Sequence, residues 1–451
     1  MEEKRERLSS RLGFILLSAG CAIGLGNVWT FPWRVGNNGG GAFLLCYIIA
    51  LIVIGLPVMT AEFAIGRAAQ KSPVFMYQSL AKQGKKKWGF FGYLSLIGNC
   101  ALMLFYTTIA GYFFYYLFKF ITGDIEVLEF GATISNTSMN VICMLIVVVI
   151  GFVVLSFNMQ KGLEKVTKYI MLALFALMIV LAIRSCTMSG AKEGVAFYLK
   201  PDFSKINGNV IIAAVKQAFF SLSLGMGSMA IFGSYIGKDR SLVGESVSVI
   251  SLDTFVALMA GFIIFPACFT YDIPVDAGPP LLFTTMVTVF DNMPGGRIWG
   301  SLFFLFMIFA AMSTVLAVFE NILAMVRDLT GWSRKKGCLI LGIAMAVLCL
   351  PMALEGSVLS GFYSAAQDGP GLGFLDLWSS IVETLIQPLG SVAMLAFIAS
   401  GKFGWGWDEF VKEANAGKGI KVKTWMKPFF TIVVPILVFA LWVYGLVIYR
   451  W

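Results

Sequence analysis

Two clusters of glycine interrupt long apolar segments of this chain, one in SAGCAIGLGNVW and one in SLSLGMGSM. Glycine costs about 1 kcal/mol relative to alanine inside a helix, so each cluster marks a point where a helix can open. The residues are Gly20, Gly24 and Gly26 in the first segment and Gly225 and Gly227 in the second. In a bilayer, exposed backbone groups are tolerated only where they line a cavity or hold a ligand. Two such openings in matching positions of two halves predict a substrate and ion site near the membrane midplane.

Side-chain oxygens also lie inside apolar segments. Asp253 stands in VISLDTFVALMAG, Glu62 in AEFAIGR, and the pair Ser313–Thr314 in FAAMST. An intramembrane carboxylate is costly and is functional by default, and hard cations prefer oxygen ligands. Each of these residues also has a structural alternative. Hydroxyls in apolar helices can bond to carbonyls of the preceding turn, and Asp253 or Glu62 could be a buried acid that only hydrogen-bonds to its neighbours. Taken alone, these residues permit an ion site without requiring one.

The elements that must position these residues are membrane helices. The chain has 451 residues, of which 58% are hydrophobic and 13% charged, and its mean hydropathy is +0.83. Apolar runs of about 20 residues recur, as helical spans require and barrel strands do not. We expect an all-α membrane protein with eleven spans: 13–35, 41–69, 88–121, 139–157, 163–184, 209–235, 242–270, 297–329, 337–353, 372–399 and 427–449.

The distribution of basic residues predicts the topology. With the N-terminus in the cytoplasm, 25 of the 34 Lys and Arg residues fall on the cytoplasmic side. This asymmetry follows the positive-inside rule, so the net charge of +9 favours a topogenic role and not a nucleic-acid partner. We therefore expect a multi-pass protein of the cell (inner) membrane, with the C-terminus outside and the proline-rich region 274–295 in an outer loop.

Composition also argues against catalysis. The chain has no histidine, which removes the commonest metal ligand and general base. Its eight cysteines have no paired spacing, and most lie in apolar runs, as small buried hydrophobes do. We find no P-loop and no Ser-Lys or Asp-Asp constellation, and we expect a protein that is not an enzyme.

Several ordered motifs resemble the neurotransmitter:sodium symporter family. They are RLGFILLSAGCAIGLGNVWTFP, NGGGAF, LPVMTAEFAIGR, FFSLSLGMGSMAIFGSY, FAAMST and FLDLW, and they cover essentially the whole chain. The resemblance implies one transporter domain (1–451) with a 5+5 inverted repeat and discontinuous helices 1 and 6. Spans 1–5 (13–184) would form the first repeat and spans 6–10 (209–399) the second, followed by span 11 (427–449).

The resemblance also implies how the substrate is held. Free amides near Gly24, Leu25 and Gly26 would bind a carboxylate. Tyr106 would add its hydroxyl, although the residue type alone equally suits an aromatic core. Relatives that carry monoamines have Asp at the position of Gly24, so glycine there favours an amino acid that brings its own carboxylate.

The expected pocket is apolar. No charged partner for a substrate side chain is apparent, so we expect a neutral hydrophobic or aromatic L-amino acid. Val315 would also face this pocket, and opened-helix carbonyls would take the ammonium. The residues implied for substrate binding are Ala22, Gly24, Leu25, Gly26, Leu102, Tyr106, Phe220, Ser223, Met226, Thr314 and Val318.

Two sodium ions are implied as cosubstrates. The first would be bound by Ala22, Asn27, Ser221 and Asp253 together with the substrate carboxylate. The second would be bound by Gly20, Ile23, Ala310, Ser313 and Thr314. Many relatives have Asn at the position of Asp253 and require chloride. A carboxylate supplies that negative charge itself, so we expect chloride-independent transport, and Asp253 could take up a proton when the site is empty.

Residues at both ends of this site match the family's gates. On the cytoplasmic side Arg5 and Asp328 form the expected ion pair, supported by Ser234, Tyr235 and Glu320.

On the outside, Asp376 matches the acidic partner, but Thr30 replaces the usual arginine. Arg34 lies one turn further along the same helix face, and we expect it to take over.

The reading from sequence is sodium-coupled symport of an amino acid across a lipid bilayer by alternating access. An amino-acid sensor built on a transporter scaffold and an ion channel remain as alternatives. Coupled, saturable flux favours a symporter over a channel, and counterflow of labelled amino acid distinguishes it from a sensor.

Overall fold

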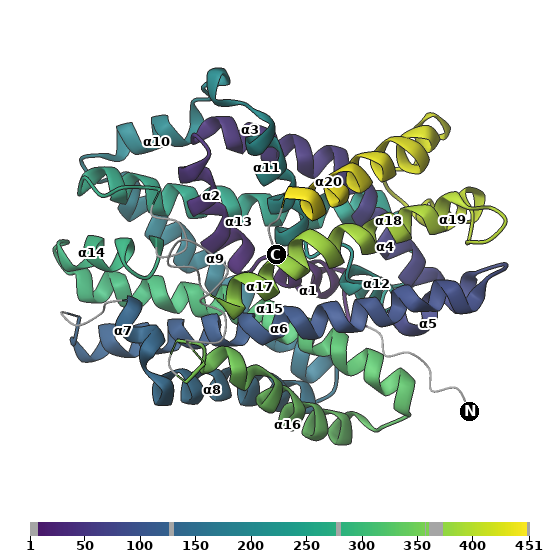
Figure 1. Cartoon of the computed structure of the whole chain (residues 1–451), viewed down its shortest axis with the longest axis horizontal. Helices are drawn as coiled ribbons and strands as arrows, with labels where there is room; N and C mark the ends of the chain where they lie inside the picture. The colour runs from purple at the N-terminus through teal and green to yellow at the C-terminus, as the bar shows by residue number, and fades with distance from the viewer. Residues whose placement is uncertain (1–7, 126–129, 277–280, 357, 360–372, 449–451) are drawn as a thin grey trace.

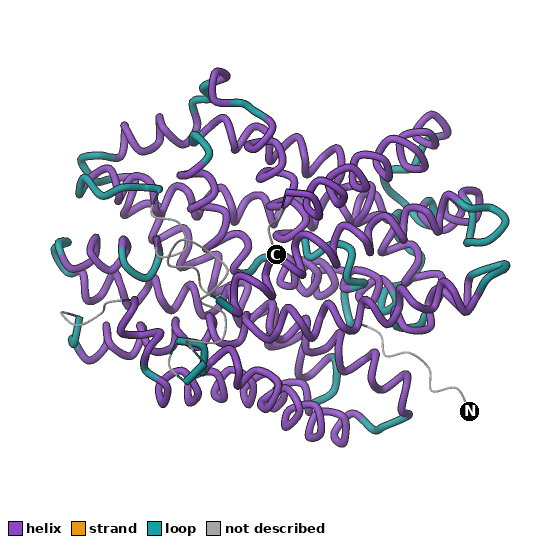
Figure 2. The backbone as a smooth tube through the Cα atoms, viewed as in Figure 1, coloured by secondary structure: helices purple, strands orange, loops and turns teal. Residues whose placement is uncertain are grey.

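The computed structural model describes residues 8–125, 130–276, 281–356, 358–359 and 373–448, apart from the side chains of 85, 161, 374–376 and 448. Within this part of the chain the regular structure is helical, and the only strand-like pairings are the isolated bridges Gly40–Pro201 and Arg240–Lys418 (Figure 2). The expected all-α class is confirmed.

Nine helical segments of the described chain are long and apolar enough to cross a membrane. They contain α3 (Gly41–Ala50), η2 (Leu51–Gly55) and α4 (Leu56–Ala69); α6 (Lys85–Thr122); α8 (Thr137–Ser156); η3 (Gln160–Glu164) and α9 (Lys165–Cys186); α13 (Leu242–Thr270); α15 (Gly296–Thr330); α16 (Arg334–Ala353); α17 (Phe374–Ser380), η6 (Ile381–Ile386) and α18 (Gln387–Ala399); and η7 (Thr424–Met426), η8 (Phe429–Val433) and α20 (Val434–Ile448). They correspond to nine of the eleven expected spans.

The first span is broken where its glycines predict. Helix α1 (Arg11–Ala22) ends before Ile23, whose φ of −72° and ψ of 97° are extended. The chain resumes as η1 (Gly26–Thr30) and α2 (Phe31–Asn37), bent by 52° from α1. The carbonyls of Gly20, Cys21 and Ile23 therefore accept hydrogen bonds from side chains of α15, and the Leu25 amide donates to a side chain of α6.

The sixth span is broken as well. Helix α11 (Gly208–Ser221) and helix α12 (Ser228–Gly233) are separated by a turn over residues 222–227. In this turn φ is positive at Ser223 (50°), Gly225 (81°) and Gly227 (73°), a region that favours glycine. A Cβ on Gly225 would lie 1.9 Å from the Gln387 carbonyl oxygen, so glycine also permits close packing against α18.

Short helices connect the spans: α5 (Pro73–Leu80), α7 (Phe130–Ser135), α10 (Ala191–Leu199), η4 (Phe203–Lys205), α14 (Thr285–Asp291) and α19 (Trp407–Ala414). Helix α14 lies in the proline-rich region that we expect in an outer loop.

The broken helices lie inside the molecule. In Figure 1 the labels of α1 and α12 lie near its centre, and α1 from Gly13 onward and all of α12 are buried. By contrast, α16 and α20 expose large apolar side chains such as Leu339, Ile343 and Val447. Such exposed apolar surface suits contact with lipid. The helix breaks are thus shielded from lipid by the surrounding spans.

Candidate substrate and ion site

The opened first span meets Tyr106 of α6. The buried Tyr106 hydroxyl accepts a hydrogen bond of 2.8 Å from the Leu25 backbone amide, which the break leaves without a helical partner. A Cβ on Gly24 would lie 2.2 Å from both the Tyr106 hydroxyl and Thr314 Oγ1. Any side chain at position 24 would therefore displace the groups that converge there.

A small pocket lies beside this contact. It is lined by Cys21, Ala22, Gly24, Gly26, Leu102, Tyr106, Phe220, Ser223, Thr314 and Gln387. Eight of these lining residues belong to the expected substrate set, whereas Cys21 and Gln387 do not. Its unfilled interior has room for about one water molecule, so an amino acid requires the walls to move apart.

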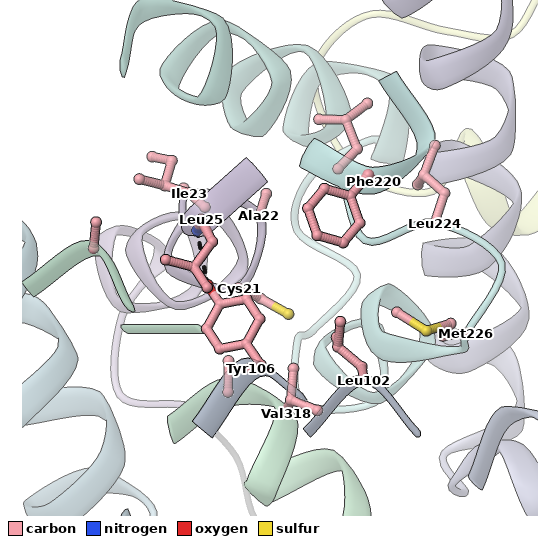
Figure 3. Packing of buried hydrophobic residues seen from close by; sticks show 14 of the residues in the cluster. Cys21, Ala22, Ile23, Leu25, Leu102, Tyr106, Phe220, Leu224, Met226 and Val318 are labelled. Atoms are coloured by element: carbon pink, nitrogen blue, oxygen red, sulfur yellow. Dashed lines mark hydrogen bonds between the residues drawn. The ribbon is translucent and has the colours of Figure 1, made fainter. Parts of the chain in front are cut away.

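Three expected substrate residues do not line this cavity: Leu25, Met226 and Val318. Leu25 takes part through its amide. In Figure 3, Val318 lies beside Tyr106 and Leu102, and Met226 lies on the far side of Leu102.

Three of the four residues expected for the first sodium ion, Asn27, Ser221 and Asp253, lie together beside Tyr47 of α3. Asn27 Nδ2 donates to Asp253 at Oδ1 (2.8 Å) and at the backbone oxygen (2.9 Å). The Tyr47 hydroxyl lies 3.0 Å from Ser221 Oγ and donates to Asp253 Oδ2 at 3.3 Å. Asn27 Oδ1 is buried and has no hydrogen-bond partner among the described residues. A free amide oxygen beside a buried carboxylate fits a sodium ion.

The five residues expected for the second sodium ion also come together. Ser313 Oγ lies 3.0 Å from the Ile23 carbonyl and 2.9 Å from the Ala310 carbonyl. Thr314 Oγ1 lies 3.2 Å from the Gly20 carbonyl and 3.3 Å from that of Ile23. The end of α1 thus directs its unpaired carbonyls at two hydroxyls of α15, and the cluster offers only oxygen ligands.

Arg34 forms a buried ion pair on one side of the cavity. Arg34 Nη2 lies 2.6 Å from Glu383 Oε2, and Arg34 Nη1 donates to Gln217 Oε1 at 2.9 Å. Thr30 also donates to Gln217. The side chain of Asp376, the expected partner, lies outside the described residues, so the acid seen with Arg34 is Glu383.

The opposite end of the site holds a polar network. Arg5 lies outside the described residues, and Asp328 accepts a hydrogen bond from the Ser72 amide at 2.8 Å. The Tyr235 hydroxyl donates to Glu320 at 3.1 Å, and Arg334 pairs with the same carboxylate at 2.5 Å. Glu320 of α15 thus links the turn that follows α12 to α16.

Comparison with known proteins agrees with this geometry. Residues 5–127 and 124–451 match the sequence profile of the Sodium:neurotransmitter symporter family. The chain belongs to this family. It is 30% identical to an uncharacterized sodium-dependent transporter of Haemophilus influenzae, over 98% of this chain and 99% of the relative. It is 32% identical to the sodium-dependent transporter YhdH of Bacillus subtilis, over 88% of each chain.

A solved structure of the family has the same fold. The crystal structure of MhsT in complex with L-phenylalanine superposes with a TM-score of 0.86 at 35% identity, over 98% of this chain and 100% of that one. This chain is thus a sodium-dependent symporter and a multi-pass membrane protein. Its five-plus-five helix architecture with broken helices 1 and 6 is that of the symporter family.

Not every contact of this symporter is expected from its sequence. Glu164 accepts hydrogen bonds from the Ser9 amide (2.9 Å) and the Ser9 hydroxyl (2.6 Å), and from Ser10 Oγ (3.3 Å). A Cβ on Gly13 would lie 1.9 Å from Glu164 Oε1. Glu164 therefore holds the start of α1 against the fifth span. The sequence gives no more indication of this contact than an acidic residue next to an apolar run.

Glu62 has a structural partner in the other broken helix. Its carboxylate accepts hydrogen bonds from the amides of Gly225 (2.5 Å) and Met229 (3.2 Å). These are amides that the break in the sixth span leaves free. Of the two roles open to Glu62, this geometry favours stabilising the opened backbone.

Proposed function

We propose that this symporter couples two sodium ions to the inward transport of a neutral hydrophobic or aromatic L-amino acid, without a requirement for chloride. The observation that carries the proposal is the hydrogen bond between the Leu25 amide and the Tyr106 hydroxyl beside Gly24. Two donors lie together at a point that has no acid of its own, as a site for a carboxylate requires.

An amino acid satisfies each part of this pocket. Its carboxylate would bind the Leu25 amide and the Tyr106 hydroxyl, while backbone carbonyls near Ala22 and Ser223 would take its ammonium group. Its side chain would lie against Leu102 and Phe220. The L-phenylalanine bound in MhsT supports an aromatic ligand, since that protein shares the fold at 35% identity.

Sodium would bind next to the substrate in the first site. Asn27 Oδ1 and the Asp253 carboxylate supply protein oxygens, and the substrate carboxylate would complete the coordination. Because ion and substrate would share ligands, each would raise the affinity of the other by the same factor. A second ion at Ser313 and Thr314 would tie α15 to the end of α1.

Asp253 supports chloride independence. Its carboxylate is fully buried, and no Lys or Arg is recorded in contact with it in the described chain. This negative charge would balance a bound sodium ion without an external anion.

Alternating access would open one side of the site at a time. With the N-terminus in the cytoplasm, the Arg34–Glu383 pair would close the site toward the outside. The cytoplasmic side would be closed by the contacts of Ser9, Ser10, Tyr235 and Asp328. The sodium gradient would drive the cycle, and each charge that crosses 100 mV supplies about 2.3 kcal/mol.

Proteoliposomes test this function. The purified protein is reconstituted with an inward sodium gradient, and uptake of labelled aromatic and aliphatic amino acids is measured in chloride or gluconate. We expect uptake that needs sodium and is equal in both anions. Uptake without sodium would contradict the coupling, and a loss of uptake in gluconate would contradict chloride independence.

A further inference from the structure

One wall of the cavity contains a buried amide whose oxygen has no partner. Gln387 is the first residue of α18, is fully buried and lines the cavity. Its Nε2 donates a long hydrogen bond of 3.4 Å to the Phe219 carbonyl, and this contact favours Oε1 as the end of the amide that accepts. Its Oε1 has no hydrogen-bond partner among the described residues.

The other polar side chains of the wall are engaged. Tyr106 holds the Leu25 amide, Ser223 Oγ donates to the Cys21 carbonyl at 3.2 Å, and Thr314 Oγ1 lies against the carbonyls of the opened helix. Among the lining side chains, Gln387 Oε1 is therefore the acceptor left without a partner in the described structure. A buried acceptor with no donor destabilises a protein unless a ligand or water supplies one.

The position of Gln387 separates it from the carboxylate end of the pocket. Its amide reaches Phe219 at the end of α11, next to Phe220, and its backbone packs on Gly225. In Figure 3, Phe220 and Met226 lie across the view from Leu25 and Tyr106. A substrate whose carboxylate lies at Leu25 would thus extend its side chain toward the Gln387 side.

We propose that Gln387 Oε1 accepts a hydrogen bond from the substrate side chain, so that the pocket prefers an aromatic amino acid whose ring bears an N–H or O–H group. Indole and phenol rings combine an apolar face, which suits Leu102 and Phe220, with such a donor. Phenylalanine and leucine leave Oε1 unpaired, and sites built around a hydrogen bond discriminate against ligands that lack it. This inference rests on the proposed amino-acid function.

A buried water is the rival occupant. Ser391, one turn along α18, also has an unpartnered hydroxyl near Gly225, and a water between the two side chains would satisfy both. In that case the substrate would gain nothing from a ring donor.

Matched ligand pairs decide between these readings. Sodium-dependent binding to the intact protein is measured for L-tyrosine against L-phenylalanine, and for L-tryptophan against 3-benzothienylalanine, in which sulfur replaces the indole N–H. We expect each donor to bind roughly 10-fold more tightly than its partner, the size of one hydrogen bond in a buried site. In Gln387→Met both ratios should fall toward one while phenylalanine binding persists.

Each other outcome overturns the inference. Equal affinities within both pairs for the unmodified protein would overturn it without requiring any variant, and would leave amino-acid transport intact. Ratios unchanged in Gln387→Met would assign the discrimination to another group. Sodium-independent binding, or no binding of any amino acid, would instead remove the proposed function on which the inference rests.

Discussion

Arg34 and Glu383 form a buried ion pair, with Nη2 and Oε2 only 2.6 Å apart and each side chain 11% exposed. The pair joins the far end of the broken first span to the π-helical turn of the tenth. Because nearly all of the charge is withdrawn from water, the pair depends on both partners being present.

We therefore expect Glu383→Gln to destabilise the protein and to slow uptake. Removing one partner of a buried pair costs about 3–5 kcal/mol, since the other charge stays buried. Thermal unfolding of the purified protein measures the first effect and proteoliposome uptake the second. The exchanged pair Arg34→Glu/Glu383→Arg should recover part of both losses. If Glu383→Gln unfolds and transports as the unmodified protein does, Glu383 is not the gate partner of Arg34.

The carboxylate of Asp253 should determine the anion requirement. Asp253→Asn retains a side-chain oxygen and the hydrogen bond from Asn27 but loses the charge. We expect uptake by this variant to require chloride, whereas the unmodified protein transports equally in chloride and gluconate. A variant that remains active without chloride would contradict the role given to Asp253.

The second ion site predicts a loss of sodium affinity in Thr314→Val. The substitution removes a hydroxyl that lies 3.2–3.3 Å from three carbonyls of the opened helix. We expect the sodium concentration for half-maximal binding of amino acid to rise roughly 10-fold, as for one lost ligand worth about 1.4 kcal/mol. Thr108→Val is the matched control, because that buried hydroxyl has no recorded partner in the described chain. Equal shifts in both variants would argue against an ion at Thr314.

Glu164 should hold the cytoplasmic side closed. Glu164→Gln weakens the contacts to Ser9 and Ser10, and hydrogen bonds to charged groups are worth about 1.5–3 kcal/mol each. We expect a lower thermal midpoint and several-fold weaker amino-acid binding, since the closed form becomes less populated. Lys165→Gln changes an exposed neighbour and serves as the control. No difference between the two variants would show that Glu164 does not stabilise closure.

The sequence predicts the two helix breaks because glycine destabilises a helix interior, and a cluster of glycines in an apolar segment can be recognised from the sequence alone. It does not predict that Ser223 adopts positive φ, because serine rarely adopts this conformation and its sequence gives no sign of it. The oxygen cluster at Ser313 and Thr314 is predicted by the resemblance to the family motifs. Without that resemblance, two adjacent hydroxyl residues could equally bond to carbonyls of the preceding helical turn. Expectations for the individual ligands remain predictions until binding is measured.

Longer-range contacts escape sequence reasoning for a different reason. The acid paired with Arg34 is Glu383. The direction of its side chain depends on the π-helical turn over Ile381–Ile386, and no residue pattern in the sequence predicts this turn. Tyr47 and Gln387 are missed because a tyrosine or glutamine in an apolar helix has no distinctive spacing. Their roles emerge only once α3, α13 and α18 are packed around the two breaks.

The central claim is that the two opened helices hold an amino acid and sodium together. The most direct measurement is equilibrium binding of a labelled aromatic amino acid to the purified protein over a series of sodium concentrations, with potassium as the replacement ion. We predict no binding in potassium and an affinity for the amino acid that rises with sodium, with an equal rise of sodium affinity as amino acid is added. Binding that is the same in sodium and potassium would contradict the account.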